Sequence, residues 1–174
     1  MKTSWSRSVC GSCIWLNGSS STVSVRDTPS LQLTSRVTVA IWLNSGISNG
    51  TDPRIVAKLY DWDIKLNGNS RYPQFSTGGK YAMLNRSLPM GVWQHVVFTF
   101  SSGVVKGYVN GQPVAFAQNT FTGSETLPTN QYGLFFGSAG DNTSYFGGFL
   151  DDIRIYNREL TAADVAALYS QTMH

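Results

Sequence analysis

The sequence predicts an all-β fold, an antiparallel two-sheet β-sandwich with a short C-terminal helix. From residue 14 onward, short segments of alternating hydrophobicity recur about every ten residues, and Gly, Asn, Pro and Ser separate them. Only the last dozen residues have a helical pattern. A chain of 174 residues is long enough to bury an ordinary core within one domain. We therefore expect one sandwich domain at residues 14–174, preceded by an arm at residues 1–13.

Four segments show the two-residue period of a strand. In the first of them Val37, Val39, Ile41 and Leu43 point to one face, and the residues between them point to the other. One face of this strand is therefore expected to lie in the core. The other three predicted strands are residues 93–100, 133–137 and 149–156.

A hairpin and a helix start are the clearest local signals. Asn110-Gly111 is the favoured pair for a two-residue type I′ turn, because both positions need a positive φ. Strands at residues 104–109 and 112–117 are therefore expected to pair. Thr161 and Asp164 have the spacing of a capping box, and the apolar residues that follow predict a short helix packed on the sandwich.

The composition points toward a neutral polar ligand. Charged residues make up 13% of the chain, about half the usual fraction, whereas Ser, Thr and Asn are frequent. Such a surface suits sugars or another protein. The 13 basic residues are scattered singly, which argues against nucleic-acid binding. No segment approaches the roughly 20 apolar residues that would cross a bilayer, so we expect no membrane insertion.

The N-terminal region offers little chemistry. Its first 20 residues lack the apolar core of a secretory signal. Cys10 and Cys13 form a C-x-x-C motif without a second pair or a histidine partner, so a metal site is not indicated. Two thiols in an N-terminal arm are the favoured interpretation, and a small local disulfide is the alternative.

Catalysis is not expected. Glycosidases need two carboxyl groups on opposite sides of the sugar. The only glutamates, Glu125 and Glu159, fall in a predicted loop and beside the predicted helix. Asp61 and Asp63 would share a strand face, but exposed charges at a hairpin end are the favoured interpretation. His95 has no nucleophile motif beside it and is expected to be a packed, hydrogen-bonded residue.

The order of several segments resembles the laminin-G-like branch of the concanavalin A-like lectin/glucanase superfamily. The resemblance extends over roughly residues 14–170. Its most specific part is the closing segment Phe149-Leu-Asp-Asp-Ile-Arg-Ile-Tyr-Asn-Arg-Glu-Leu-Thr161. Other matching segments are Leu16–Ser20, Val23–Val25, Ser30–Leu33, Val37–Trp42, Trp93–Phe100 and Gly107–Gly111. The resemblance implies a laminin-G-like jelly roll, a curved two-sheet sandwich that binds ligands on its loops or its concave sheet.

The resemblance also implies a calcium ion near one edge of the sandwich. Asn17 of the opening turn and Asp151 of the final strand occupy the family's ligand positions. Asp151 alternates with Ile153 and Ile155 and is therefore expected to point inward. The usual aspartate of the opening turn is Asn17 here, which lowers the charge of the site and should weaken calcium binding.

Aromatic side chains near polar loops are the candidates for sugar binding. Tyr60, Trp62, Tyr72 and Tyr81 cluster before the central strand, and residues 141–145 form a polar loop with an aromatic end. Burial in the core is the alternative for each aromatic ring. The predicted ligand-binding residues are Trp62, Tyr72, Asn142 and Tyr145.

Two settings fit a binding module. The chain begins at Met1 without a secretory signal, which favours a phage or virus surface protein, either a capsid decoration or a tail adhesin with lectin-like glycan recognition. Its arm would then bind neighbouring capsid or tail subunits in an oligomeric assembly on the virion surface. The alternative is an extracellular, calcium-assisted carbohydrate-binding module of a secreted bacterial enzyme or adhesin.

Overall fold

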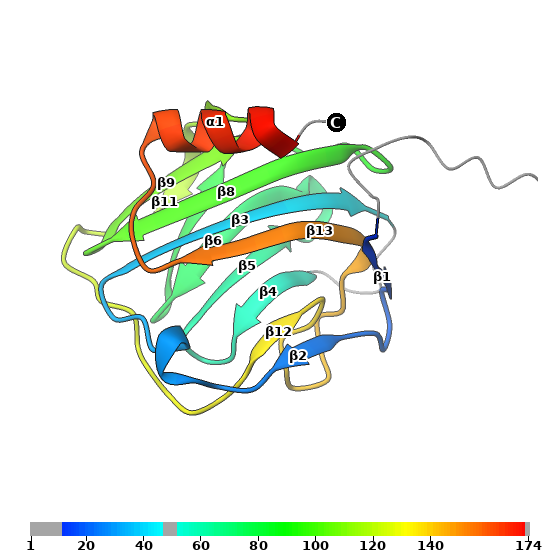
Figure 1. Ribbon diagram of the computed structural model, residues 1–174, viewed down its shortest axis with the longest axis horizontal. Helices are drawn as coiled ribbons and strands as arrows, with labels where there is room; N and C mark the ends of the chain where they lie inside the picture. Colours follow the sequence, from blue (N-terminus) through cyan, green and yellow to red (C-terminus); the bar gives the residue numbers. More distant parts are fainter. Residues whose placement is uncertain (1–11, 47–51, 173–174) are drawn as a thin grey trace, which may run out of the picture.

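The computed structural model describes residues 12–46 and 52–172, and it is a sandwich of two antiparallel sheets (Figure 1). The predicted all-β class is confirmed. The six-stranded sheet contains, in spatial order, β1 (Ile14–Asn17), β13 (Gly147–Tyr156), β3 (Arg36–Ser45), β8 (Trp93–Ser101), β9 (Val104–Val109) and β10 (Gln112–Pro113). The seven-stranded sheet contains β11 (Phe116–Asn119), β7 (Lys80–Leu84), β6 (Tyr72–Thr77), β5 (Trp62–Asn67), β4 (Arg54–Lys58), β12 (Leu134–Phe136) and β2 (Val23–Val25).

The described part of the chain also contains three short helices. Two are single 3₁₀ turns, η1 (Pro29–Leu31) and η2 (Gly68–Ser70), and the third is α1 (Ala162–Thr172). Within the described residues no helix is long and apolar enough to cross a membrane.

The core lies between the two sheets, and every second residue of the central strands points into it. Val37, Val39, Ile41 and Leu43 of β3 are all at most 1% exposed and belong to the main core cluster, which confirms the predicted face of this strand. The seven-stranded sheet contributes the matching side chains from β4, β5, β6 and β7. Because the side-chain period of a strand is two, the intervening residues of β5 and β6 lie on the outer face of that sheet.

The Asn110-Gly111 turn has the predicted geometry. Their φ angles are 53° and 75°, and Gln112 and Pro113 pair with Val109 and Tyr108. The predicted partner strand at residues 112–117 is wrong beyond Pro113. Val114 still donates to the Gly107 carbonyl oxygen at 2.9 Å, but the chain then crosses and joins the other sheet as β11. A proline in this strand has no N–H with which to continue the ladder.

Helix α1 begins at the predicted capping box. The Asp164 N–H donates to Thr161 Oγ1 at 3.1 Å, and the Thr161 N–H donates to Asp164 Oδ2 at 3.0 Å. Val165 and Leu168 are buried against a second apolar cluster on the outer face of the six-stranded sheet. Figure 1 shows the helix lying across that face. The predicted packing of a C-terminal helix on the sandwich is confirmed.

His95 is packed beneath this helix. Its ring lies 5.2 Å from the Trp42 ring and 5.9 Å from the Tyr169 ring of α1, and the residue is 1% exposed. The predicted packing is confirmed, but neither ring nitrogen has a hydrogen-bond partner among the described residues. Burial lowers the pKa of His95 to about 4, although the charge of Asp152 acts in the opposite direction.

We expect His95 to make the fold sensitive to acid. Its pKa in the folded protein lies below the unfolded value of about 6.5, so the unfolded state binds more protons between these values and stability falls as the pH falls through this window. The total loss is about 3 kcal/mol. Urea unfolding between pH 4 and 7 measures it against His95→Phe, which should lose less stability over the same range. Equal losses in both proteins would contradict the assignment.

Cys13 is disulfide-bonded. The favoured interpretation of two thiols is therefore wrong at this position. Cys10 lies outside the described residues. Most of the predicted arm at residues 1–13 lies outside them as well.

Candidate functional site

A cavity of about 220 Å³ lies against the outer face of the seven-stranded sheet, where the β4–β5 and β6–β7 hairpins turn. We call it the hairpin pocket. Its volume suits a small ligand and falls below that of sites for drug-sized molecules. The residues that carry its chemistry are Arg54, Tyr60, Asp63, Ser76 and Asp141.

The strand register sets the floor of the hairpin pocket. Asp63 of β5 lies directly opposite Ala57 of β4 and Ser76 of β6, so the three side chains share one face. Arg54 Nε lies 3.4 Å from Asp63 Oδ2, and both side chains are about one-fifth exposed. Burial raises the pKa of Asp63, while the charge of Arg54 acts to lower it. The floor is thus a partly buried ion pair beside a hydroxyl group.

Two exposed tyrosines form an aromatic rim beside this floor. Tyr60 lines the pocket and is 70% exposed, and Tyr132 is 53% exposed. Their ring centroids are 5.4 Å apart in an edge-to-face arrangement. The φ of Tyr60 is +66°, a left-handed conformation that is strained for a bulky side chain. Such strain costs about 1 to 3 kcal/mol and persists only where the surroundings enforce it.

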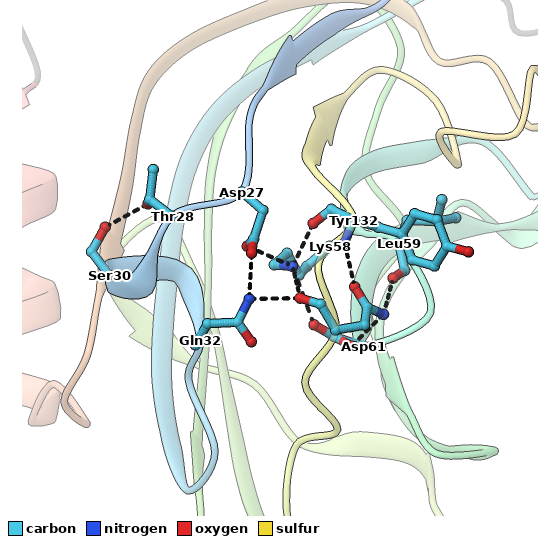
Figure 2. A network of polar contacts seen from close by, with 9 residues as sticks. Asp27, Thr28, Ser30, Gln32, Lys58, Leu59, Asp61 and Tyr132 are labelled. Atoms are coloured by element: carbon cyan, nitrogen blue, oxygen red, sulfur yellow. Dashed lines mark hydrogen bonds and ion pairs between the residues drawn. The ribbon is translucent and has the colours of Figure 1, made fainter.

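A buried polar network fixes the two loops that carry Tyr60 and Tyr132, which we call the tyrosine loops (Figure 2). Lys58 is fully buried, and its Nζ lies 3.4 Å from Asp61 Oδ2 and 3.1 Å from Asp27 Oδ1. Asn130 Nδ2 donates to the Leu59 carbonyl oxygen and to Asp61 Oδ1, both at 2.7 Å. The residues on either side of Tyr60 are therefore bonded to the loop that precedes Tyr132.

The same network fixes Tyr132 itself. Its N–H donates to Asn130 Oδ1 at 2.8 Å, and its carbonyl oxygen accepts from Lys58 Nζ at 2.5 Å. Satisfied buried networks of this kind are rigid. The aromatic rim is therefore preformed, and its rings stay exposed because the backbone beneath them is held.

The structure brings three of the four predicted ligand-binding residues to the hairpin pocket region. Trp62 lines the pocket but is 4% exposed and stacks on Phe75, so the alternative of burial in the core is correct for its ring. Asn142 follows Asp141 in the loop that borders the pocket, and Tyr145 of that loop forms a bridge with Arg54.

Tyr72 lies apart from the other three predicted residues. It is paired with Asn67, on the same outer face as Ser76. Ser76 is four residues further along β6, which corresponds to roughly 13 Å. Tyr72 is therefore not part of the hairpin pocket.

The prediction that Asp61 is an exposed charge at a hairpin end is also wrong. Asp61 is 3% exposed and precedes β5, so it does not share the face of Asp63. Burial raises the pKa of Asp61, while Lys58 acts to lower it. Sequence reasoning also missed Lys58, Asn130 and Tyr132. The available signal was a lysine at the end of the otherwise apolar segment 55–58, three residues before an aspartate.

Asn17 and Asp151 do not form a shared calcium site. Asn17 pairs with Gly147, and Asp151 lies four residues further along β13, roughly 13 Å away. Calcium ligands lie within 2.6 Å of the ion, so the two side chains are too far apart. Asn17 Oδ1 instead accepts the N–H groups of Ser19, Ser20 and Ser21.

The predicted inward orientation of Asp151 is also wrong. A β-bulge between Asp151 and Arg154 interrupts the alternation, and Asp152 within it has a φ of +44°. Asp151 therefore lies opposite Trp42 on the outer face, whereas Ile153 and Ile155 pack against the core. Calcium as a cofactor stays a prediction that these two residues do not support.

Comparison with known families agrees with this architecture. A family model described as the concanavalin A-like lectin/glucanases superfamily matches residues 17–166. The chain belongs to this superfamily. A curated relative, adhesion G-protein coupled receptor V1 of Danio rerio, is 27% identical over 79 residues, which is 45% of this chain and 1% of the receptor.

Solved structures show the same fold in binding domains. A candidate carbohydrate-binding protein from Bacteroides ovatus superposes with a TM-score of 0.71 at 16% identity, over 88% of this chain and 47% of that one. The binding domain of Paraclostridial Mosquitocidal Protein 1 gives 0.70 at 20% identity, over 91% and 43%. Domain 4 of an extracellular arabinanase from Geobacillus stearothermophilus, in complex with arabinotriose, gives 0.64 at 23% identity, over 90% and 76%. The predicted jelly-roll sandwich is confirmed, and this chain spans less than half of the first two.

Proposed function

We propose that this protein is a non-catalytic, lectin-like binding module whose hairpin pocket holds one sugar ring of a neutral glycan. The observation that carries the proposal is Tyr60, an exposed aromatic residue held in a strained conformation beside a polar pocket. Strained residues that the surroundings enforce cluster at ligand-binding sites. An aromatic ring beside hydrogen-bonding groups is the combination that a sugar requires, because a pyranose has an apolar face and a polar edge.

The polar groups of the pocket suit hydroxyl groups better than charges. Ser76 both donates and accepts, while Asp63 and Asp141 supply carboxyl oxygens. The two cations that act on Asp63 are both already paired, Arg54 with Asp63 itself at 3.4 Å and Lys65 with Asp52 at 2.8 Å. An acidic sugar would meet two carboxyl groups at this site, so we expect neutral sugars to bind more tightly.

The names of the similar structures agree with a role in binding. One is described as a candidate carbohydrate-binding protein, one is the binding domain of a toxin, and one was solved with arabinotriose although it comes from an enzyme. The placement of Asp61 also favours binding over hydrolysis. Its carboxyl group is bonded to Lys58 and Asn130, so Asp61 and Asp63 do not face each other across a ligand.

The setting of the module stays a prediction. A glycan-binding surface fits an extracellular protein, either an adhesin or a module of a secreted enzyme. It fits a capsid decoration or a tail adhesin on a virion surface equally well. Neither assembly into an oligomer nor a capsid or tail partner follows from the hairpin pocket.

A glycan array with neutral and acidic oligosaccharides tests the proposal. We expect binding to a subset of neutral glycans, and unchanged glycans after long incubation with the protein. Binding to no glycan would sink the lectin-like function, and release of new reducing ends would sink its non-catalytic character. Addition of a chelator to the same array tests the calcium-assisted alternative, which requires that binding be lost.

A further inference from the structure

The ammonium group of Lys58 occupies a cage of four oxygen atoms (Figure 2). Two are the carboxylate oxygens of Asp27 at 3.1 Å and Asp61 at 3.4 Å. The other two are the main-chain carbonyl oxygens of Asn130 at 3.2 Å and Tyr132 at 2.5 Å. The Lys58 side chain is 0% exposed, so the ammonium has no bulk water around it.

The cage contains more oxygen atoms and more negative charge than one lysine ammonium can pair with. An ammonium has three N–H donors, and four oxygen atoms surround it. One of the four, the Asn130 carbonyl oxygen, also accepts from Gln32 Nε2 at 2.6 Å. The two carboxylates carry two negative charges against one positive charge, which leaves a net charge of −1. Carboxylate and main-chain carbonyl oxygens are the ligand types that calcium prefers, since it is a hard cation that takes six to eight oxygens including water.

We propose that this cage is a cation site whose occupant is the chain's own Lys58 ammonium, and that a calcium-sized divalent ion takes its place when the ammonium is removed. Calcium–oxygen distances are 2.3 to 2.6 Å, so the oxygens at 2.5 to 3.4 Å from Nζ would move inward by about 1 Å at most. Space left by a shortened side chain would hold the remaining water ligands.

The proposal has a consequence for the native protein. The two tyrosine loops are joined through this cage, and an internal ammonium holds them without an added metal. The hairpin pocket should therefore keep its shape in the presence of a chelator. This consequence rests on the proposed function only where it concerns glycan binding. The cation site itself is tested without any glycan, so the two can fail separately.

The test compares the thermal unfolding midpoint of the wild type and of Lys58→Ala with excess calcium chloride and with EDTA. We expect the wild-type midpoint to be the same in both. The Lys58→Ala midpoint should be lower than that of the wild type in EDTA. It should rise by about 5 to 10 °C once calcium exceeds its dissociation constant about 100-fold. Calorimetric titration of Lys58→Ala with calcium chloride should give one site per chain.

Two matched variants separate cation binding from general effects of calcium. Lys58→Met fills the cage with an apolar side chain and should not respond to calcium. The triple variant Lys58→Ala, Asp27→Asn, Asp61→Asn keeps the space but loses both carboxylates, and it should bind calcium at least about 100-fold more weakly than Lys58→Ala. If Lys58→Ala does not fold in EDTA, its refolding on addition of calcium, followed by circular dichroism, is the expected result.

Three outcomes would overturn the proposal. They are a Lys58→Ala protein that calcium neither stabilises nor refolds, an equal calcium response of Lys58→Met, and a wild-type midpoint that falls in EDTA.

Discussion

Replacement of Tyr60 by glycine is expected to weaken glycan binding roughly 30-fold while it raises the stability of the protein. The lost ring is the exposed aromatic surface of the hairpin pocket, and removal of a central aromatic contact costs about 2 kcal/mol of binding free energy. Glycine adopts a φ of +66° without strain, so the free energy of unfolding should rise by about 0.5 to 1 kcal/mol. Calorimetric titration with the glycan and urea unfolding measure the two changes.

Opposite signs for affinity and stability distinguish a binding residue from a structural one. Tyr60→Phe keeps the ring and should bind within about threefold of the wild type, a difference worth less than the 1.4 kcal/mol of a tenfold change. Trp15→Ala is the matched control, because Trp15 is 62% exposed on β1 of the other sheet. It should leave affinity unchanged. Equal losses of affinity in Trp15→Ala and Tyr60→Gly would rule out the assignment of the hairpin pocket.

Replacement of Lys58 by methionine is expected to lower the free energy of unfolding by about 3 to 5 kcal/mol. Methionine has a similar length but no charge, so the carboxylates of Asp27 and Asp61 would remain close together without their cation. Urea unfolding measures the loss. We also expect weaker glycan binding, since the same network holds Tyr60 and Tyr132 in place.

An exposed ion pair provides the control for Lys58→Met. Lys106 Nζ lies 2.8 Å from Glu159 Oε1, but the Lys106 side chain is 54% exposed. Lys106→Met should therefore cost about 1 kcal/mol or less. A loss of similar size in both variants would show that the Lys58 network does not hold the fold together. Replacing Lys58 and both aspartates with apolar residues should recover part of the loss, because no uncompensated charge then remains.

Local signals in the sequence predicted much of the fold. The alternation in β3, the Asn110-Gly111 turn and the capping box at Thr161 each act through neighbouring residues, and each is found in the structure. One error arose where a single residue changes the phase of a strand. The bulge at Asp152 turned Asp151 to the outer face, and it has no local signal because only the pairing with β3 defines it.

The candidate site was harder to predict because distant segments form it. Trp62 and Tyr60 belong to the same aromatic cluster in the sequence, but the phase of β5 buries Trp62 and the left-handed turn exposes Tyr60. Tyr132 joins Tyr60 through Asn130, about 70 residues away from Leu59. Neither that contact nor the burial of Lys58 leaves a periodic pattern. Composition favours a neutral polar ligand, since charged residues make up only 13% of the chain, and the class of ligand stays a prediction.

The most direct test of glycan binding at the hairpin pocket is a nuclear magnetic resonance titration of the wild-type protein with a neutral glycan that it binds. We predict that the largest amide shift changes fall on Tyr60, Asp63, Ser76 and Tyr132. The amides of β1 around Trp15 should stay unchanged. Shift changes that concentrate on the six-stranded sheet, or on no single surface, would contradict the account.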